Sequence, residues 1–509
     1  MDLNHPAGAA DDGPTRAVEL VAGDFLLTVN PVDGSEIESC PPGRRPIAPR
    51  RAPAGTGDGE PSPAPLLERD EERHRLYRLL ARGRSVLLTG PPGVGRTALL
   101  DAVARDCARL APDGVIRLSG YRRTRDDLLH ELHAAVHHTP AYRPGATELA
   151  AGLREIGAVV ALDDVEFGAA ALDELLEATP ECAFLIAAEP GVPAPGAESR
   201  LEEVFLAGIS RTASLELLEL SLGRPLNEAE TDWAADLWFE TEGLPLRFVQ
   251  AAAVLRGRDE SSRAPLPNAA TLTATLVKAL SEGARVILRY AVALGGEIPA
   301  PSRLPVLTGH PNTVADHDEL LAGGLLTAVG HRHRVAPLVT GELLAAGFGD
   351  GSADRVLAAA RHYAWWLAQP DATPPAVAGE ADVLLAIVRS AQREGHAASV
   401  AALARVAAPP LAAALRWGAW ERVLRTGQEA ARAAGEVADE AYFHHELGVL
   451  AIVQGRLDRA RAELEASTAL RSVLSDAGGA VTGRRALALV EDLSSPRAQT
   501  PPEGIPPVD

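Results

Sequence analysis

The sequence of 509 residues predicts a multidomain protein of mixed α/β and α class, in which a parallel α/β domain precedes several helical domains. Three observations predict this architecture. Apolar strands alternate with helices up to residue 207, strand patterns become scarce after residue 208, and the C-terminal region is rich in Ala and Leu at helical spacing. The chain is too long for one ordinary core, so we expect three or four units.

The composition is that of a globular protein, with 46% hydrophobic and 23% charged residues. The formal charge of −20 disfavours non-specific attraction to nucleic acid or to anionic lipid. No apolar run reaches the roughly 18 residues of a membrane span, and the acidic N-terminus lacks the apolar centre of a secretory signal. Cys40, Cys107 and Cys182 lack paired spacing and fit a reducing compartment, so we expect a cytoplasmic protein without a membrane contact.

Residues 1–65 form a Pro-rich arm that we expect to be largely disordered. Within it, residues 24–40 alternate in polarity and turn through Asn30-Pro31 and Asp33-Gly34, which predicts a short hairpin. An isolated hairpin is only marginally stable, so this one needs other surface to pack on. The hairpin could be a docking element or a lid over the next domain, and the sequence leaves both alternatives open.

Residues 66–207 are expected to form the α/β domain. A helix ends at Gly83, and a second helix begins directly after a Gly-rich loop. The expected strands, in order, are SVLLTG, GVIRLSG, GAVVALDDVE and CAFLIAAE, with the helix RDDLLHELHAAVHH between the second and the third. Strands that alternate with helices imply a parallel sheet covered on both faces.

The rest of the chain is expected to be helical. Residues 208–265 read as a helical subdomain around a Gly-Leu-Pro turn, and residues 266–350 as three helices and a small hairpin, the outline of a winged helix. Residues 351–492 are helical, and residues 493–509 form a loose tail.

Two windows near the end of the chain resemble each other when Gly418 is aligned with Gly455. Their spacing is slightly over the roughly 34 residues of a tetratricopeptide (TPR) unit. A TPR-like array is therefore expected, with an ordinary helical bundle as the alternative.

Adjacent histidines at His137–His138 and His444–His445 lack a third metal ligand at the right spacing, which favours a solvated helix face or a helix end. The tryptophans of the helical region are expected to be core anchors, or else to line a partner groove. They are Trp365, Trp366, Trp417 and Trp420.

The motif GPPGVGRT matches the phosphate-binding pattern G-x-x-x-x-G-K-[ST] except that Arg96 stands in the lysine position. Its glycines let successive backbone N–H groups converge on one anion, and the following helix adds its positive end. Thr97 would place its hydroxyl on Mg²⁺. The expected nucleotide-binding residues are Gly90, Pro91, Pro92, Gly93, Val94, Gly95, Arg96, Thr97 and Ala98.

A second acidic motif ends the buried strand at residues 159–164. We expect this strand to carry Asp163 to a position beside Thr97, where it would hold Mg²⁺ through water, while Asp164 would orient or deprotonate an attacking water as the catalytic residue. The alternative is two solvated acids at a strand end.

Arg96 keeps the positive charge of the missing lysine, but it is planar and bulkier, so the replacement is not conservative. Lys278 is the only lysine in the chain, which shows that arginine is preferred throughout the composition. Most of the loop's hold on a phosphate comes from backbone N–H groups. Binding is therefore expected to survive better than catalysis, which depends on accurate placement of charge.

The order of these parts resembles the signal-transducing NTPases with numerous domains, the STAND class, and in particular the bacterial relatives of the NB-ARC proteins. The matching pieces, LLERDEE, GPPGVGRT, VVALDDV, EGLPLRF and the winged-helix region, span about residues 66–345. The resemblance implies that Pro245 lies against the base or sugar of the nucleotide and that the winged helix closes over it. It further implies a closed ADP state, an open ATP state, and helical repeats that sense a protein partner.

Three departures from that family pattern favour a slow or inactive switch. Ala187, Ala188 and Glu189 stand where a γ-phosphate sensor is usual, Ala336 stands where a histidine reads ADP, and Arg96 replaces lysine. His331 and His333 could replace the missing histidine or lie on the surface.

The leading hypothesis is an ATP/ADP-binding, Mg²⁺-dependent regulatory switch that signals through protein contacts of its C-terminal helices and hydrolyses ATP weakly or not at all. The alternatives are an active ATPase, a nucleotide-free scaffold, and a winged-helix DNA-binding regulator. The last is disfavoured because the segment TGHPNTVADHDELLAGG is acidic and lacks Arg and Lys. Homo-oligomerisation is open.

Overall fold

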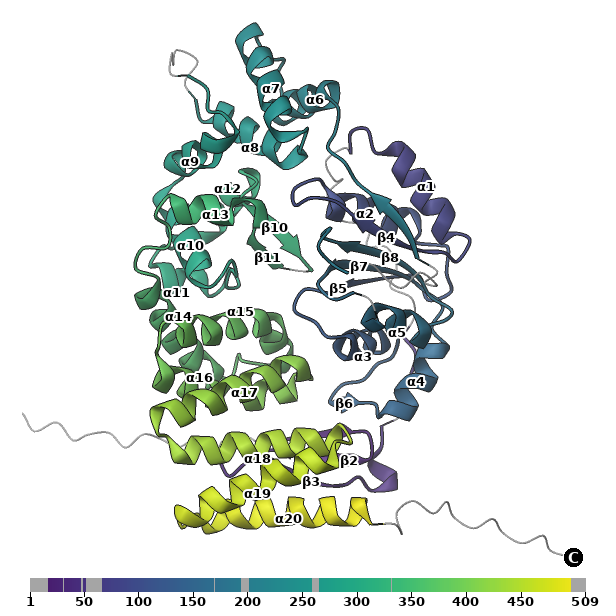
Figure 1. The fold of residues 1–509 in the computed structure, drawn as a ribbon, viewed down its shortest axis with the longest axis vertical. Helices are drawn as coiled ribbons and strands as arrows, with labels where there is room; N and C mark the ends of the chain where they lie inside the picture. The colour runs from purple at the N-terminus through teal and green to yellow at the C-terminus, as the bar shows by residue number, and fades with distance from the viewer. Residues whose placement is uncertain are drawn as a thin grey trace, which may run out of the picture.

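The structure of the chain is a computed structural model that describes residues 17–30, 32–46, 49–51, 66–168, 170–193, 201–258, 265–330 and 332–495. The α/β domain faces a long column of helices, and the N-terminal strands lie beside the last helices of that column (Figure 1). The predicted class, a parallel α/β domain followed by helical domains, is confirmed.

The central sheet has five parallel strands in the order β5-β7-β8-β4-β9. They are β4 (Ser85–Thr89), β5 (Val115–Ser119), β7 (Val159–Val165), β8 (Ala183–Ala188) and β9 (Leu201–Phe205). Four of them were predicted. The fifth, β9, was not, because its sequence LEEVF is half polar, as an edge strand with a solvated side can be.

Helices cover both faces of this sheet, so each face has its own apolar core. The helices α1 (Asp70–Leu80) and α2 (Arg96–Asp106) pack on one face with Val86 and Leu88 of β4. The opposite face, which includes Leu87, is covered by three helices. These are α3 (Arg125–Val136), α4 (Ala146–Arg154) and α5 (Ala170–Ala178). Successive side chains of β4 point to opposite faces of the sheet, so this strand contributes to both cores.

The next two expected units share one apolar core. The first three helices are α6 (Arg211–Leu222), α7 (Glu228–Thr241) and α8 (Pro245–Arg256). They are followed by α9 (Ala269–Ala279), α10 (Glu282–Ala293), α11 (Leu304–Thr308), α12 (Thr313–Ala322), the hairpin β10 (Leu326–Val329) and β11 (Arg332–Val335), and α13 (Pro337–Ala345). Phe248 of α8 is fully buried in the same cluster as Leu272 and Ile287, so the two units are packed together.

Seven helices then form the helical array, the name used here for residues 352–495. They are α14 (Ser352–Leu367), α15 (Pro374–Arg393), α16 (Ala397–Ala413), α17 (Trp417–Ala434), α18 (Val437–Val453), α19 (Leu457–Val473) and α20 (Ala477–Ser494). Trp366, Trp417 and Trp420 are buried anchors as expected, whereas Trp365 is 58% exposed. The expected solvated position is wrong for His445, which is fully buried in α18.

The N-terminal arm, defined here as residues 17–51, contributes a small sheet in the order β3-β2-β1-β6. The predicted hairpin is β2 (Phe25–Val29) and β3 (Glu36–Ser39), and a further strand, β1 (Val18–Ala22), precedes it. The fourth strand, β6 (Tyr142–Arg143), belongs to the α/β domain and pairs in parallel with β1. Apolar residues of the arm, such as Leu27, join the core of the helical array, so the hairpin is a docking element.

None of the helices in the described ranges is long and apolar enough to cross a membrane.

Candidate functional site

The Gly-rich loop of residues 90–95 joins the buried strand β4 to the helix α2, as the motif requires. Gly93 and Gly95 have φ angles of 86° and 97°, a left-handed conformation that glycine adopts without strain. Gly95 is the N-cap of α2 and provides no side-chain cap. The first N–H groups of α2 are therefore left for an anion at the positive end of the helix.

Two helices from the helical half of the chain begin against this loop. The backbone N–H of Leu246, in the first turn of α8, donates to the carbonyl of Gly93 at 3.2 Å. A Cβ on Gly93 would lie 3.0 Å from Leu246 Cβ and 3.2 Å from Leu338 Cδ2 of α13. Pro245, the first residue of α8, therefore lies in the turn of that helix that begins against the loop.

Asp163, near the end of β7, and Thr97 line the same cavity, and the side chain of Thr97 lies close enough to act on the Asp163 carboxyl, so the structure brings the two expected Mg²⁺ ligands together. Burial raises the pKa of Asp163 to about 6, and the neighbouring Asp164 adds to this rise. A hydroxyl beside a carboxylate is an oxygen donor set that suits Mg²⁺, so these residues fit the ion.

Arg96 is held by the protein itself. Its guanidinium donates to the carbonyl of Gly90 at the start of the loop and lies 3.7 Å from Glu189 Oε1. The side chain is only 11% exposed. From the sequence, Glu189 was expected only to stand where a γ-phosphate sensor is missing, and its pairing with Arg96 was not predicted. The sequence did contain a signal for this ion pair. Arg96 and Glu189 follow the neighbouring parallel strands β4 and β8, and the carboxyl ends of parallel strands lie at the same edge of the sheet.

Asp164, the expected catalytic residue, is paired with a cation from the hairpin. Nη2 of Arg334 in β11 lies 3.3 Å from Asp164 Oδ2. Burial raises the pKa of Asp164, and Arg334 opposes that rise. The backbone of Asp164 has a φ of 52°, which a non-glycine residue adopts at a cost in energy. In this arrangement the carboxylate is engaged by the hairpin.

His333 does not take the place of the missing histidine beside the loop. Its ring lies against His317 of α12, with ring centroids 5.0 Å apart, inside its own domain. Ala336 is buried at the N-cap of α13, and the side chain of Leu338 in that helix lies against the loop. His331 lies outside the described residues.

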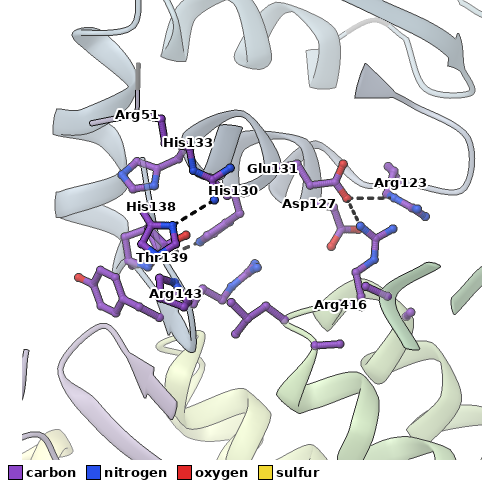
Figure 2. Close-up of a pocket in the computed structure, with 18 of the residues that line it drawn as sticks. Arg51, Arg123, Asp127, His130, Glu131, His133, His138, Thr139, Arg143 and Arg416 are labelled. Atoms are coloured by element: carbon purple, nitrogen blue, oxygen red, sulfur yellow. Dashed lines mark hydrogen bonds and ion pairs between the residues drawn. The ribbon is translucent and has the colours of Figure 1, made fainter. Parts of the chain in front are cut away.

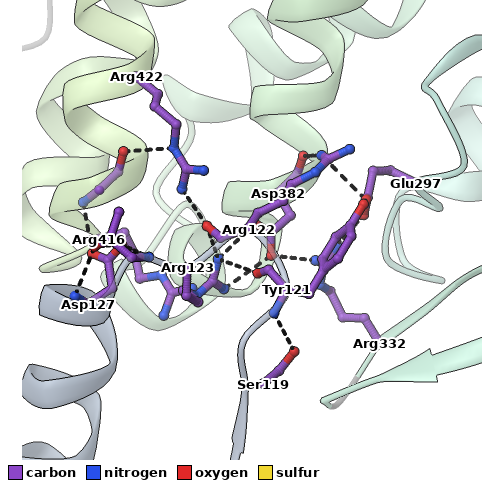
Figure 3. Close-up of polar contacts among 12 residues, drawn as sticks. Ser119, Tyr121, Arg122, Arg123, Asp127, Glu297, Arg332, Asp382, Arg416 and Arg422 are labelled. Atoms are coloured by element: carbon purple, nitrogen blue, oxygen red, sulfur yellow. Dashed lines mark hydrogen bonds and ion pairs between the residues drawn. The ribbon is translucent and has the colours of Figure 1, made fainter. Parts of the chain in front are cut away.

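A cluster of charges joins the α/β domain to the hairpin and to the helical array (Figure 3). The segment after β5 supplies Tyr121, whose hydroxyl donates to Glu297 at 2.5 Å, and Arg123, which lies 2.9 Å from Asp382 of α15. Arg332 of β11 contacts the same two carboxylates, at 3.4 Å and 2.7 Å. We call these five residues the junction.

Both acids of the junction are deeply buried, with side-chain exposures of 2% for Glu297 and 5% for Asp382. Sequence reasoning missed the junction, since its members lie far apart in the sequence, Arg123 and Asp382 by 259 positions, and show no periodic pattern. Arg334 also stacks on the ring of Tyr121, 4.3 Å from its centroid, so the ion pair on Asp164 and the junction form one continuous contact.

A cavity of 590 Å³ adjoins the Thr97–Asp163 pair and is lined in part by Arg117, Ser119 and Arg332. A second cavity, of 320 Å³, lies between α3 and the helical array (Figure 2). In the second, Glu131 accepts from Arg123 at 3.1 Å and from Arg416 at 2.6 Å. Arg123 and Arg416 are thus both paired with an acid of α3, which favours a contact between domains over an anion site.

No family model matches this chain, and no curated protein matches it either. Among solved structures, a STAND protein with a tetratricopeptide repeat sensor from Pyrococcus horikoshii is 12% identical, with a TM-score of 0.36 over 82% of this chain and 79% of that chain. Drosophila ORC bound to DNA is 14% identical, with a TM-score of 0.31 over 56% and 97%. A RuvB mutant from Thermotoga maritima is 18% identical, with a TM-score of 0.25 over 54% and 95%. The function proposed below is therefore argued from the residues of the site.

Proposed function

We propose that the chain is an ATP/ADP-binding regulatory switch of the STAND type, which signals through protein contacts of its helical array and hydrolyses ATP weakly or not at all. One observation carries the proposal. A phosphate-binding loop with an uncapped helix N-terminus, and the Thr97–Asp163 pair beside it, are covered by α8 and α13 from the helical half of the chain.

In this proposal the loop and the first turn of α2 bind the phosphates through residues 90–98, and Pro245 lies against the base or sugar. Thr97 and Asp163 hold Mg²⁺, which neutralises phosphate charge when it is bound. Because the starts of α8 and α13 contact Gly93, a ligand in the loop would touch two parts of the chain at once. Binding free energy can then favour one packing of these parts over another.

The two groups that would act on a γ-phosphate are both occupied by protein partners. Arg96 is bonded to Gly90 and paired with Glu189, and Asp164 is paired with Arg334. Each must be released before it can stabilise or start hydrolysis. This supports a closed form that retains nucleotide and turns over slowly.

We further propose a division into five functional parts after the arm. They are a nucleotide-binding domain at residues 66–207, a helical subdomain at 208–265, a winged-helix domain at 266–350, a TPR-like domain at 351–492 and a tail at 493–509. Since the second and third parts share one core, they would move as a single body relative to the first.

The test is thermal unfolding of the purified full-length chain with ATP or ADP, with and without Mg²⁺. One-site binding at a hundredfold over Kd adds about 2.7 kcal/mol of stability. We expect a shift with both nucleotides, and loss of its Mg²⁺ dependence in Asp163→Ala. The absence of a shift at millimolar nucleotide would contradict the proposal.

One observation favours a second candidate, a nucleotide-free scaffold: the guanidinium of Arg96 is hydrogen-bonded to the carbonyl of Gly90 within the loop itself. This candidate predicts that the chain purifies without nucleotide and that Arg96→Lys restores binding. Co-purified ADP or ATP would exclude it. Phosphate release that disappears in Asp163→Ala and rises in Arg96→Lys would instead identify an active ATPase.

A further inference from the structure

A turn of the N-terminal arm, residues 32–35 between β2 and β3, is inserted into the helical array. Its start is shaped locally, since the side chain of Asn30 accepts from the backbone N–H of Val32 at 2.9 Å. Gly34 has a φ of 99°, and a Cβ there would lie 2.5 Å from Cδ2 of His445. Only glycine allows the backbone to approach α18 this closely.

The array contacts every polar group of Ser35. Glu446 accepts from the backbone N–H of Ser35 at 2.6 Å and from its hydroxyl at 2.9 Å. Nε2 of His445 lies 2.8 Å from the Ser35 carbonyl and donates to it. Ser35 is 1% exposed, and both side chains from α18 are fully buried. These contacts recognise the backbone and the hydroxyl of Ser35, as the contacts of a peptide-binding site do.

Arg405 of α16 adds a contact to the same turn, donating to the carbonyl of Val32 at 2.8 Å. Its guanidinium stacks on Tyr442, 3.3 Å from the ring centroid. Arg471 of α19 lies close enough to influence the charge of Glu446. We call Arg405, Tyr442, His445, Glu446 and Arg471 the turn groove.

The turn groove carries more polar groups than the turn uses. Among the described residues, four buried side-chain atoms of the groove have no hydrogen-bond partner: Arg405 Nη1, Tyr442 OH, His445 Nδ1 and Arg471 Nε. Buried polar groups in folded proteins are nearly always paired, so this concentration needs an explanation. A ligand with more polar groups than residues 32–35 would satisfy it.

The arm that carries the turn is also attached to the α/β domain. The N–H groups of Val21 and Gly23 donate to the carbonyls of Ala141 and Arg143, each at 2.9 Å. The arm therefore bridges the α/β domain and the last helices of the array (Figure 1). Withdrawal of the turn would remove one of the ties between them.

We propose that the turn groove is a peptide-binding site whose resident ligand is the chain's own turn, and that a protein partner displaces it with a turn that has the same Gly and Ser and carries additional polar groups. This inference rests on the proposed function in one respect, namely that the partner is a protein. The docking of the turn is tested without nucleotide.

The experiment compares full-length Gly34→Val with Gly43→Ala, a matched control in the same arm, where a Cβ meets nothing within 4 Å. In Gly34→Val the turn cannot enter the groove. We expect hydrogen exchange of residues 25–39 to rise at least about tenfold in Gly34→Val and to stay at the wild-type rate in Gly43→Ala. A labelled peptide of residues 25–40 should then bind Gly34→Val and leave wild type unbound.

Two controls complete the test. The same peptide with Gly34→Val should bind neither chain, and Glu446→Gln, which keeps the size of the side chain, should weaken peptide binding when combined with Gly34→Val. Equal exchange in Gly34→Val and Gly43→Ala would overturn the docking. Faster exchange without peptide binding would overturn the displaceable site. Peptide binding by a chain that shows no nucleotide shift would retain this inference and remove the switch.

Discussion

Arg96 is the residue that decides whether the loop is expected to bind nucleotide, to hydrolyse it, or to do neither. At the sequence level it is a replaced lysine whose role has to be guessed from its charge. In the structure its guanidinium bridges the first carbonyl of the loop and the carboxylate of Glu189. Two departures from the expected motif thus compensate each other, since Glu189 neutralises the bulkier cation.

We predict that Glu189→Gln raises the affinity for ATP and ADP by about twofold to fivefold. The pair is partly exposed, and such ion pairs contribute at most about 1 kcal/mol, so its loss frees Arg96 for phosphate at small cost. The control is Glu202→Gln, which breaks a surface pair with Arg84 on the edge strand. Isothermal titration measures both, and an unchanged or lower affinity in Glu189→Gln would contradict the expectation.

His445 makes the turn groove sensitive to pH. Burial lowers its pKa from 6.5 to about 4, so it stays neutral in the folded chain while the unfolded chain takes up a proton below 6.5. This contribution to stability is lost as the pH falls through that window. Burial raises the pKa of Glu446 from 4.5 to about 7, which gives the opposite slope over nearly the same window.

In wild type the two contributions therefore offset each other, whereas His445→Gln should keep only that of Glu446 and gain stability as the pH falls. From about pH 7 to about pH 5, wild type should lose about 2 kcal/mol relative to the variant through His445. The thermal midpoint of the array measures this, with exposed His74→Gln as the control. Parallel curves for wild type and His445→Gln would show that this ring does not titrate differently on unfolding.

At the scale of elements, the loop of residues 90–95 is enclosed by the starts of two helices and by one hairpin. The helices α8 and α13 contact Gly93, and β11 places Arg334 on Asp164. Glycine at position 93 is required both by its positive φ and by this close packing. The hairpin is thus the element that both covers the acidic motif and meets the junction.

We predict that Arg334→Gln accelerates release of a fluorescent ADP analogue by about tenfold, because it removes the charged contact between the hairpin and the end of β7. Arg285→Gln, which breaks an exposed pair with Glu282 on α10, should leave the release rate unchanged. Stopped-flow displacement measures both rates. Equal rates would place the closing contact elsewhere.

Element prediction succeeded where one face of an element is buried in its own domain. The buried strands β4, β7 and β8 and the long helices have apolar runs or helical periods that the sequence shows directly. Two strands of the small sheet were not predicted: β6, which is two residues long, and β1, which pairs with the adjacent β2 on one side and with the distant β6 on the other. Also not predicted were α4 and α5, nine-residue helices in connecting segments.

At the scale of the whole molecule, two of the ties that hold the α/β domain against the helical half involve residues far from the loop. One is the junction, in which Asp382 of α15 meets arginines from the α/β domain and from the hairpin. The other is the N-terminal arm, which pairs with β6 and inserts its turn into the array. Both ties join parts that the proposed switch has to separate.

We predict that Asp382→Asn opens the chain. Removing one partner of a buried ion pair costs up to about 3–5 kcal/mol, and here Arg123 and Arg332 each lose one of their two carboxylate partners. The radius of gyration from small-angle scattering should rise in Asp382→Asn. It should not change in Asp371→Asn, whose exposed pair with Arg303 lies within the helical half. A larger radius in both variants, or in neither, would contradict the role of the junction.

The sequence by itself determined the phosphate-binding loop, the strand that carries Asp163, the parallel class of the sheet and the helical character of the rest. These features are written in short stretches, in glycine spacing and in periods of two or 3.6 residues. Only the tertiary structure decided that Arg96 meets Glu189, that Arg334 meets Asp164, and that Ser35 meets Glu446 across 411 residues. Charge pairing and burial depend on which surfaces meet in space, and they leave no period along the chain.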